Sequence, residues 1–202
     1  MLFRSLFGGH SAELAATPMP EPTVSDGAVS TIDRPILSAD PTDRMTCRST
    51  YNPHEVRLGN GLVKLVDFEI VVDGIVDPPV IPKHAEVELL VKLYFSEALH
   101  RVSFGFALVS VDGVYVAGTN SEMANGPYLT ADAGKCLLVR LRWCAHLVGG
   151  EYFLNVGCHY FLEGEKTFLD VRRSLAKLKI ADTPNSYGFV DLEYSVSVES
   201  PI

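Results

Sequence analysis

The sequence predicts an all-β protein, an immunoglobulin-like or jelly-roll antiparallel β-sandwich with a disordered N-terminal tail. From about residue 58 onward, short apolar or alternating runs are separated by Gly, Pro, Asn and Asp, which is typical of an antiparallel sandwich. Residues 104–120 contain an especially clear β-hairpin pattern. A chain of 202 residues with 47% hydrophobic content has material for one buried domain and a tail.

The N-terminal quarter of the chain has a different composition from the rest. Residues 11–50 are rich in Pro, Ser, Thr and Asp and show neither helical nor strand periodicity. We therefore expect a disordered tail or linker over residues 1–50 and the folded sandwich over residues 51–202.

Eight strands are expected in the sandwich, over residues 62–73, 85–96, 101–111, 114–119, 135–144, 151–161, 173–181 and 188–199. The hairpin pattern comes from Asp112-Gly113, which joins two runs of β-branched and aromatic residues. Residues 174–180 contain good helix formers, but their alternation favours a strand. Two sheets packed face to face are the simplest way to bury this many strands.

Alternation within a strand assigns its side chains to faces, because successive residues point to opposite sides of a sheet. In residues 135–144 the inward positions are Leu137, Val139, Leu141 and Trp143, which turns Arg140 and Arg142 outward. In residues 151–161 the inward positions are Leu154, Val156 and Cys158, which turns Asn155, Gly157 and His159 outward.

The short turn at residues 147–150 suggests that these two strands pair with each other. Matching their buried faces then sets Trp143 opposite Leu154 and Arg142 beside Asn155. This register predicts an outward polar cluster beside Gly157, formed by Arg140, Arg142, Asn155 and His159.

The charge of the chain bears on its partners. With 17 basic and 25 acidic residues the formal net charge is −8, which disfavours nucleic acid and anionic membrane surfaces as partners. The apolar runs are too short to span a membrane and the first ten residues do not form a secretory signal. We therefore expect no transmembrane segment and a cytoplasmic location.

The chain lacks the common catalytic patterns. No phosphate-binding loop, Gly-x-Ser-x-Gly, HExxH or GxGxxG motif is present, and the four cysteines form no CxxC pair. We expect no catalytic, metal or cofactor site. Two alternatives stay open: a zinc site formed by Cys144, His146, Cys158 and His159, and a glycoside-cleaving pair drawn from Asp112, Glu122, Glu151, Glu163 and Asp170.

Four segments together resemble a known family. Phe104–Leu108, the Asp112-Gly113 turn and Gly118-Thr119-Asn120 are similar to the C-terminal carbohydrate-binding domain of Wzt, the ATPase subunit of the ABC transporters that export O-antigen polysaccharide. Residues 57–65, 150–159 and 188–192 also resemble strands of that domain, so that the likeness extends from about residue 58 to residue 198. The ATPase half of Wzt has no counterpart in this sequence.

The resemblance implies a fold, a ligand and partners. Members of the family are β-sandwiches that bind the exported O-polysaccharide near its modified non-reducing end and dimerise by exchanging the last strand. The final run is compatible with exchange, because Val190, Leu192, Tyr194, Val196 and Val198 alternate with polar residues after a hinge-like stretch at residues 181–187. An ordinary intramolecular edge strand is the alternative.

We therefore expect a non-catalytic module that binds a lipid-linked O-antigen or a related polysaccharide. Sugar sites combine aromatic rings with planar polar side chains, and the candidates here are Tyr94, Tyr115, Arg140, Arg142, Asn155 and His159. Expected partners are a second copy of the chain and an ABC transporter or a glycosyltransferase. The alternative function is a structural adaptor that only dimerises and docks to another protein.

Overall fold

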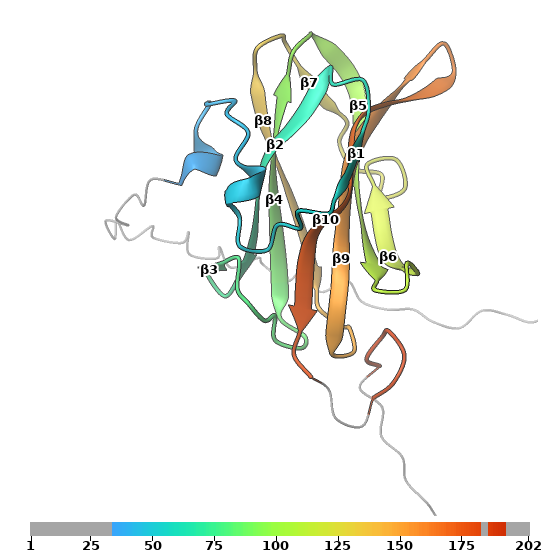
Figure 1. The fold of residues 1–202 in the computed structure, drawn as a ribbon. Coiled ribbons are helices and arrows are strands. Elements are labelled where there is room, and N and C mark those ends of the chain that lie inside the picture. Colours follow the sequence, from blue (N-terminus) through green and yellow to red (C-terminus); the bar gives the residue numbers. More distant parts are fainter. Residues whose placement is uncertain (1–33, 183–185, 193–202) are drawn as a thin grey trace, which may run out of the picture. The chain divides into compact units, whose positions relative to one another are not determined.

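The computed structural model describes residues 34–182 and 186–192 (Figure 1). Two short 3₁₀ helices come first, η1 (Pro35–Leu37) and η2 (Met45–Cys47). The strands are β1 (Val56–Leu58), β2 (Val63–Val72), β3 (Ile75–Val76), β4 (Glu86–Phe95), β5 (Leu99–Ser110), β6 (Tyr115–Asn120), β7 (Leu129–Ala131), β8 (Cys136–Cys144), β9 (Gly150–Leu162) and β10 (Glu165–Ile180).

The strands of residues 34–192 form two antiparallel sheets packed as layers, as Figure 1 shows. One is six-stranded with the order β1-β10-β9-β5-β6, and β7 pairs with β5 off this path. The other is four-stranded with the order β3-β2-β4-β8. The predicted all-β antiparallel sandwich is confirmed.

Alternating apolar side chains from both sheets form one core. The inward positions of β4 are all at most 1% exposed: Val87, Leu89, Val91, Leu93 and Phe95. From the other sheet, Leu154, Val156 and Cys158 of β9 are also buried, as their alternation predicts. Burial of apolar surface on this scale is the main force that holds the two layers together.

The predicted hairpin is confirmed. Strands β5 and β6 pair with Phe106 opposite Thr119 and Val109 opposite Tyr115. Gly113 takes a φ of +81° in the turn, a conformation that glycine adopts without strain. The turn is closed by the Gly113 amide, which donates to the Ser110 carbonyl at 2.9 Å.

The predicted pairing of residues 135–144 with residues 151–161 is wrong. Strand β8 pairs with β4, which sets Trp143 opposite Val87 and Arg142 opposite Glu88. Strand β9 lies in the other sheet between β5 and β10. The turn between β8 and β9 crosses from one layer to the other, and the inward face of Trp143 meets the second sheet through a stacked ring contact with Phe106 at 5.3 Å.

Residues 173–181 are part of a strand, as predicted in preference to a helix, but that strand begins at Glu165. A two-residue turn, Glu163-Gly164, joins β9 to β10, and both residues have positive φ (52° and 87°). A bulge between Arg172 and Ala176, with Ser174 at a φ of +55°, breaks the alternation of β10. A second register shift, between Phe168 and Asp170, interrupts the first half of the strand, and the two irregularities together hide that half from a sequence pattern. The short strands β1, β3 and β7 were also missed.

The predicted disorder of residues 1–50 is wrong for residues 34–50. This segment, which we call the strap, lies against β2 and β4 on the outer face of the four-stranded sheet (Figure 1). Ile36 and Met45 are buried, and the Lys92 ammonium donates to the carbonyls of Pro35 (2.6 Å) and Asp40 (3.2 Å). Lys92 is 1% exposed, although alternation alone would place it on a solvated face. Residues 1–33 lie outside the described part of the chain.

Buried ion pairs attach the strap to β2. The Arg48 guanidinium donates twice to Asp67, at 2.8 and 2.6 Å, and its Nη1 lies 3.0 Å from Glu69 Oε1. Arg34 pairs with the same Glu69. Because the Asp67 and Glu69 side chains are 0% and 3% exposed, Arg48 and Arg34 supply the compensating charge that burial of two carboxylates requires.

The predicted last strand, residues 188–199, lies mostly outside the described residues. Within residues 186–192, Val190 forms a single antiparallel bridge with Leu147, and the Asp191 carboxylate pairs with Lys83 and His84. Among residues 34–182 and 186–192, no helix has the length and apolar character needed to cross a membrane.

Candidate functional site

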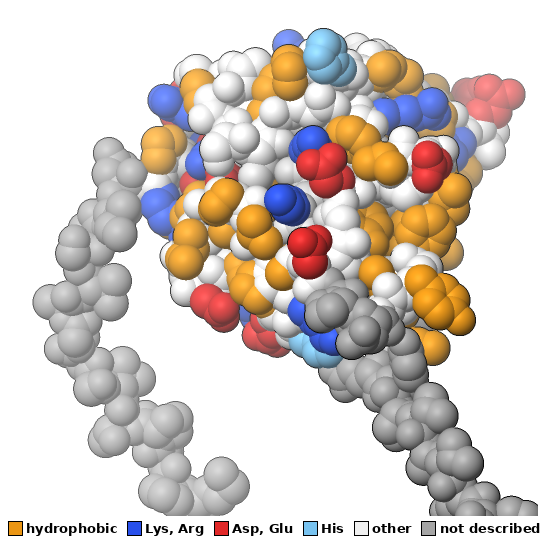
Figure 2. All heavy atoms as spheres, turned by 60° about the horizontal axis from the view of Figure 1, so that its bottom comes forward, with side chains coloured by type: hydrophobic (Ala, Val, Ile, Leu, Met, Phe, Trp, Pro, Cys, Tyr) orange, Lys and Arg blue, Asp and Glu red, His pale blue; other side chains and the backbone are white. Residues whose placement is uncertain are grey.

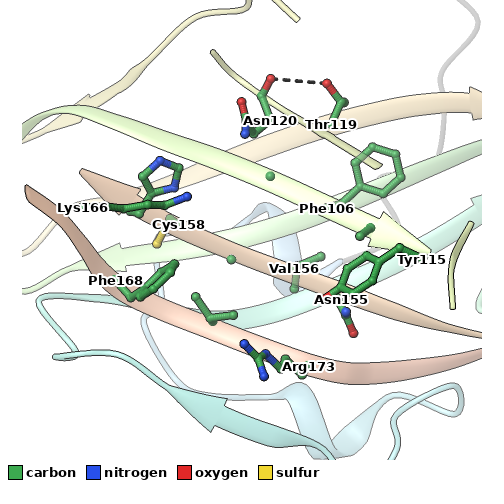
Figure 3. A pocket seen from close by; sticks show the side chains of 15 residues that line it. Phe106, Tyr115, Thr119, Asn120, Asn155, Val156, Cys158, Lys166, Phe168 and Arg173 are labelled. Atoms are coloured by element: carbon green, nitrogen blue, oxygen red, sulfur yellow. Dashed lines mark hydrogen bonds between the residues drawn. The ribbon is translucent and has the colours of Figure 1, made fainter. Parts of the chain in front are cut away.

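A shallow hollow opens on the outer face of the six-stranded sheet, over strands β5, β6, β9 and β10 (Figure 3). Its volume is about 250 Å³. Two glycines form the floor, because Gly105 of β5 lies opposite Gly157 of β9 and both point outward. We call this feature the glycine hollow.

The glycines are required by their surroundings. A Cβ atom on Gly157 would lie 2.9 Å from Val171 Cγ2, and one on Gly105 would lie 2.9 Å from Asn120 Cβ. Both distances are shorter than a van der Waals contact between carbon atoms. A larger residue at either position would therefore push the neighbouring strand or fill the hollow.

Aromatic and amide side chains line the ends of the hollow. In Figure 3, Tyr115 and Asn155 lie toward one end, and Phe168 and Lys166 toward the other. Tyr115 is 67% exposed, which leaves its ring available to a ligand. Asn155 Oδ1 accepts a hydrogen bond from the Ser174 amide at 2.6 Å, which fixes the side chain and leaves its NH₂ group as a donor toward solvent.

His159 is the buried polar group of the hollow, at 6% exposure. Its ring makes edge contacts with Phe161 and Phe168, and its Nε2 lies 3.7 Å from Glu122 Oε1. Burial, assisted by the positive charge of Lys166, lowers the pKa of His159 against the opposing effect of Glu122. The imidazole is therefore neutral at pH 7 and can both donate and accept hydrogen bonds.

The structure brings together only half of the predicted site. Tyr115, Asn155 and His159 all line the glycine hollow. Arg140 and Arg142 lie on the other sheet, on the outer face of β8, so the predicted position of Arg142 beside Asn155 is wrong. The error follows from the wrong strand pairing, because outward residues of two different layers point away from each other.

Both arginines of β8 already have a partner. Arg140 and Arg142 donate to the same oxygen of Glu88, at 3.0 and 2.8 Å. Partial burial raises the pKa of Glu88, but the hydrogen bond from Arg142 and the charge of Arg140 outweigh it and hold that pKa below its usual value. These side chains form a solvated ion-pair network on the outer face of β8, away from the glycine hollow.

Tyr94 lies apart from the other predicted residues. It lines a separate hollow that includes Lys64, Arg57 and Asp170, at the edge where the strap approaches β1 and β10. Asp170 in that hollow is bound by Arg57 at 2.9 and 2.7 Å and accepts the Leu65 amide at 2.7 Å. The Asp170 carboxylate thus links β10 to Arg57 of β1 and to Leu65 of β2.

Several residues that line the glycine hollow are not among the predicted site residues, above all Lys166, Phe168 and Arg173 of β10. The first two fall in the half of β10 that was not predicted as a strand, and Arg173 lies in the bulge. The signal in the sequence for a turn before β10 is Gly164, which has a positive φ.

The described residues contain no group of three or more His, Cys, Asp and Glu side chains that could hold a metal ion. The four cysteines are free; Cys158 alone of them is buried, while Cys47 and Cys144 are exposed. The zinc grouping that was left open as an alternative does not form among the described residues, because Cys144 belongs to one sheet and Cys158 to the other.

The fold and the hollow define the class of the protein, a two-layered antiparallel β-sandwich domain with an open recess on one sheet. A family model described as the Wzt C-terminal domain matches residues 54–192. The chain therefore belongs to the Wzt C-terminal domain family, and the predicted resemblance is confirmed. This membership connects the chain to O-antigen ABC transporters through a domain that is not the ATPase.

One solved structure agrees with this assignment, and two others are less similar. A crystal structure of the C-terminal domain of Wzt superposes with a TM-score of 0.73 and 25% sequence identity, covering 79% of this chain and 98% of that chain. A Niemann-Pick type C2 protein from Japanese carpenter ant gives a TM-score of 0.42 at 14% identity, covering 62% of this chain and 99% of that chain. A CARDB domain from Pyrococcus furiosus gives 0.33 at 12% identity, covering 62% and 100%. A comparison with curated protein sequences finds no match.

Proposed function

We propose that this chain is a non-catalytic carbohydrate-binding module that recognises an O-antigen or a related surface polysaccharide for export by an ABC transporter. The observation that supports this function best is the glycine hollow, whose bare floor leaves room for a sugar ring between Tyr115 and Phe168. The module would act on the cytoplasmic side of the membrane, on lipid-linked polysaccharide, with the transporter or a glycosyltransferase as its neighbour.

The side chains of the hollow suit a sugar. An aromatic ring stacks on the C–H face of a pyranose, and Asn155 and neutral His159 offer donors and an acceptor to its hydroxyl groups. Because each of these hydrogen bonds replaces one to water, we expect a Kd on the order of micromolar to millimolar.

A bacterial glycan array tests the proposal. Saturable binding to a polysaccharide should be lost in Tyr115→Ala, because the ring exposes most of its surface to the ligand. Tyr187→Ala is the matched control, because Tyr187 is also highly exposed and lies outside the hollow. Silence of the wild-type chain across the array, with a folded dimer, would instead support the structural adaptor.

The homodimer is a second part of the proposal, and strand β8 supports it. Within the described residues, β8 pairs only with β4, so one of its edges has no strand beside it. Its inward residues Leu137, Val139, Leu141 and Trp143 are only partly buried. A further strand along this edge would complete the burial of these side chains.

The C-terminal segment has a register that fits this edge. Val190 bridges Leu147, and the Asp191 amide donates to the His146 carbonyl at 3.1 Å. If this antiparallel register continued, Tyr194, which lies outside the described residues, would come opposite Trp143, and the alternating apolar residues of the run would face the core. In an unexchanged chain this register would run along the chain's own β8; in the exchanged dimer that we propose, residues 193–199, outside the described residues, would form the same register with β8 of the partner subunit.

A cysteine cross-link tests the exchange. The same register sets position 193 opposite Cys144, which is an exposed free thiol. With Cys47 and Cys136 replaced by Ser, Glu193→Cys should give a covalent dimer on oxidation, whereas Ser197→Cys should not. A cross-linked monomer would show that the strand stays on its own chain.

A further inference from the structure

The glycine hollow differs in charge from the rest of the chain. The protein carries 25 acidic and 17 basic residues, but the residues that line the hollow include Lys166 and Arg173 and no Asp or Glu. Elsewhere, charges of both signs are interspersed over the surface, as one face shows in Figure 2. An acid-free recess with two cations is therefore a local feature of this site.

Neither cation is neutralised by a carboxylate. Across the described ranges, Lys166 and Arg173 take part in no ion pair, whereas Arg48, Arg57 and Arg172 each pair with buried carboxylates. The Lys166 ammonium instead lies over the Phe168 ring, 5.3 Å from its centre. Both charges are thus available to a ligand.

Strand β10 presents the two cations on one face. Lys166 lies opposite Phe161 of β9 and Phe168 lies opposite His159, so both share the outward face with Val171, which lies opposite Gly157. Arg173 follows at the bulge, and Figure 3 shows its guanidinium beside the floor of the hollow. The cations therefore bracket the position that a sugar ring would occupy.

The other titratable groups near the hollow do not cancel this charge. His159 is neutral at pH 7 for the reasons given above. Glu122 lies next to His159, at 3.7 Å, but it is not among the residues that line the hollow. Among the residues that line the hollow, the charged side chains are Lys166 and Arg173, so the lining itself is positive.

We infer that the sugar that occupies the glycine hollow carries an anionic group, a carboxylate or a phosphate, which is held by Lys166 and Arg173. A neutral sugar would displace water from the Lys166 and Arg173 side chains without supplying a compensating negative charge, and this desolvation costs free energy. An anionic group restores the lost interactions, and the arginine fork matches the geometry of both carboxylate and phosphate. This inference rests on the proposed glycan-binding function.

The experiment compares acidic glycans with neutral counterparts. Uronate-containing and phosphate-substituted bacterial polysaccharides are arrayed beside the same uronate polymers after carboxyl reduction and the same phosphate polymers after dephosphorylation. We expect an acidic form to bind at least about tenfold more tightly than its neutral form, consistent with a hydrogen bond to a charged group. That preference should shrink at high salt, because exposed charges are screened. Which of the two acidic sets responds distinguishes carboxylate from phosphate.

Variants separate this inference from the proposed function. In Lys166→Met/Arg173→Gln the preference for the acidic form should fall by about tenfold or more, while Lys179→Gln, which removes an exposed lysine outside the hollow, should keep it. Equal binding of acidic and neutral forms that is lost in Tyr115→Ala would overturn the inference and leave the proposed function standing. No binding to any arrayed glycan would overturn both.

Discussion

The strap provides a quantitative test of the fold, through the substitution Arg48→Met. The change leaves most of the side-chain volume but removes the charge that faces Asp67 and Glu69, whose side chains are 0% and 3% exposed. Removing one partner of a buried ion pair costs about 3–5 kcal/mol, because the other charge stays buried without compensation. A typical domain has only about 5–15 kcal/mol of stability in total, so this loss is large.

Urea unfolding followed by tryptophan fluorescence measures the effect. Trp143 is the single tryptophan, and its stacking on Phe106 makes its emission sensitive to the packing of the two sheets. With a denaturant slope of about 2 kcal/mol per molar urea, a loss of about 4 kcal/mol lowers the midpoint by about 2 M. We expect Arg48→Met/Asp67→Asn to recover part of this loss, because the amide is uncharged.

The matched control is Arg142→Met on β8. Its side chain is 64% exposed, and Glu88 keeps its second partner Arg140, so the cost should be below about 1 kcal/mol. Equal midpoints for Arg48→Met and Arg142→Met would refute the reasoning, because they would show that the ion pairs of the strap do not hold residues 34–50 to the sheet.

Three further predictions concern the glycine hollow and its surroundings. Gly157→Ala should weaken glycan binding and lower stability by about 1–3 kcal/mol, because its Cβ would lie 2.9 Å from Val171; urea unfolding and glycan titration check this. Burial raises the pKa of Cys158 to about 12, so a thiol reagent at pH 8 should label at most the other three cysteines of the folded chain, and rapid modification of Cys158 would contradict its burial. Burial lowers the pKa of His159, so the unfolded state takes up its proton first as the pH falls. The wild type should therefore lose stability relative to His159→Gln as the pH falls from about 6.5 through the folded pKa, and a pH-independent difference would refute this.

Local patterns in the sequence were sufficient for most strands and for their faces. The Asp112-Gly113 turn specified the hairpin of β5 and β6, and alternation placed Leu89 and Leu154 inside and Asn155 outside. These features depend on neighbours two or three residues away, which a sequence displays directly. They also carried the resemblance to the family that residues 54–192 match.

Longer segments that depend on distant partners were not predictable in this way. The polar composition of residues 34–50 suggests disorder, and their fold depends on Asp67, Glu69 and Lys92, which follow far along the chain. Two register shifts, between Phe168 and Asp170 and between Arg172 and Ala176, broke the period of β10 and concealed Lys166 and Phe168. Three of the six predicted site residues line the glycine hollow, and residues of β10 such as Lys166 and Phe168 were missed.

By itself, the sequence determined which side of most strands faces the core, since a period of two separates inward from outward residues without reference to any partner. Only the tertiary structure decided which strands are neighbours. Both layers of a sandwich present the same inward pattern, so Trp143 satisfies its burial equally well beside Leu154 or across the core from Phe106. The chain crosses between layers after β8, and that crossing places Arg142 on one outer face and Asn155 on the other.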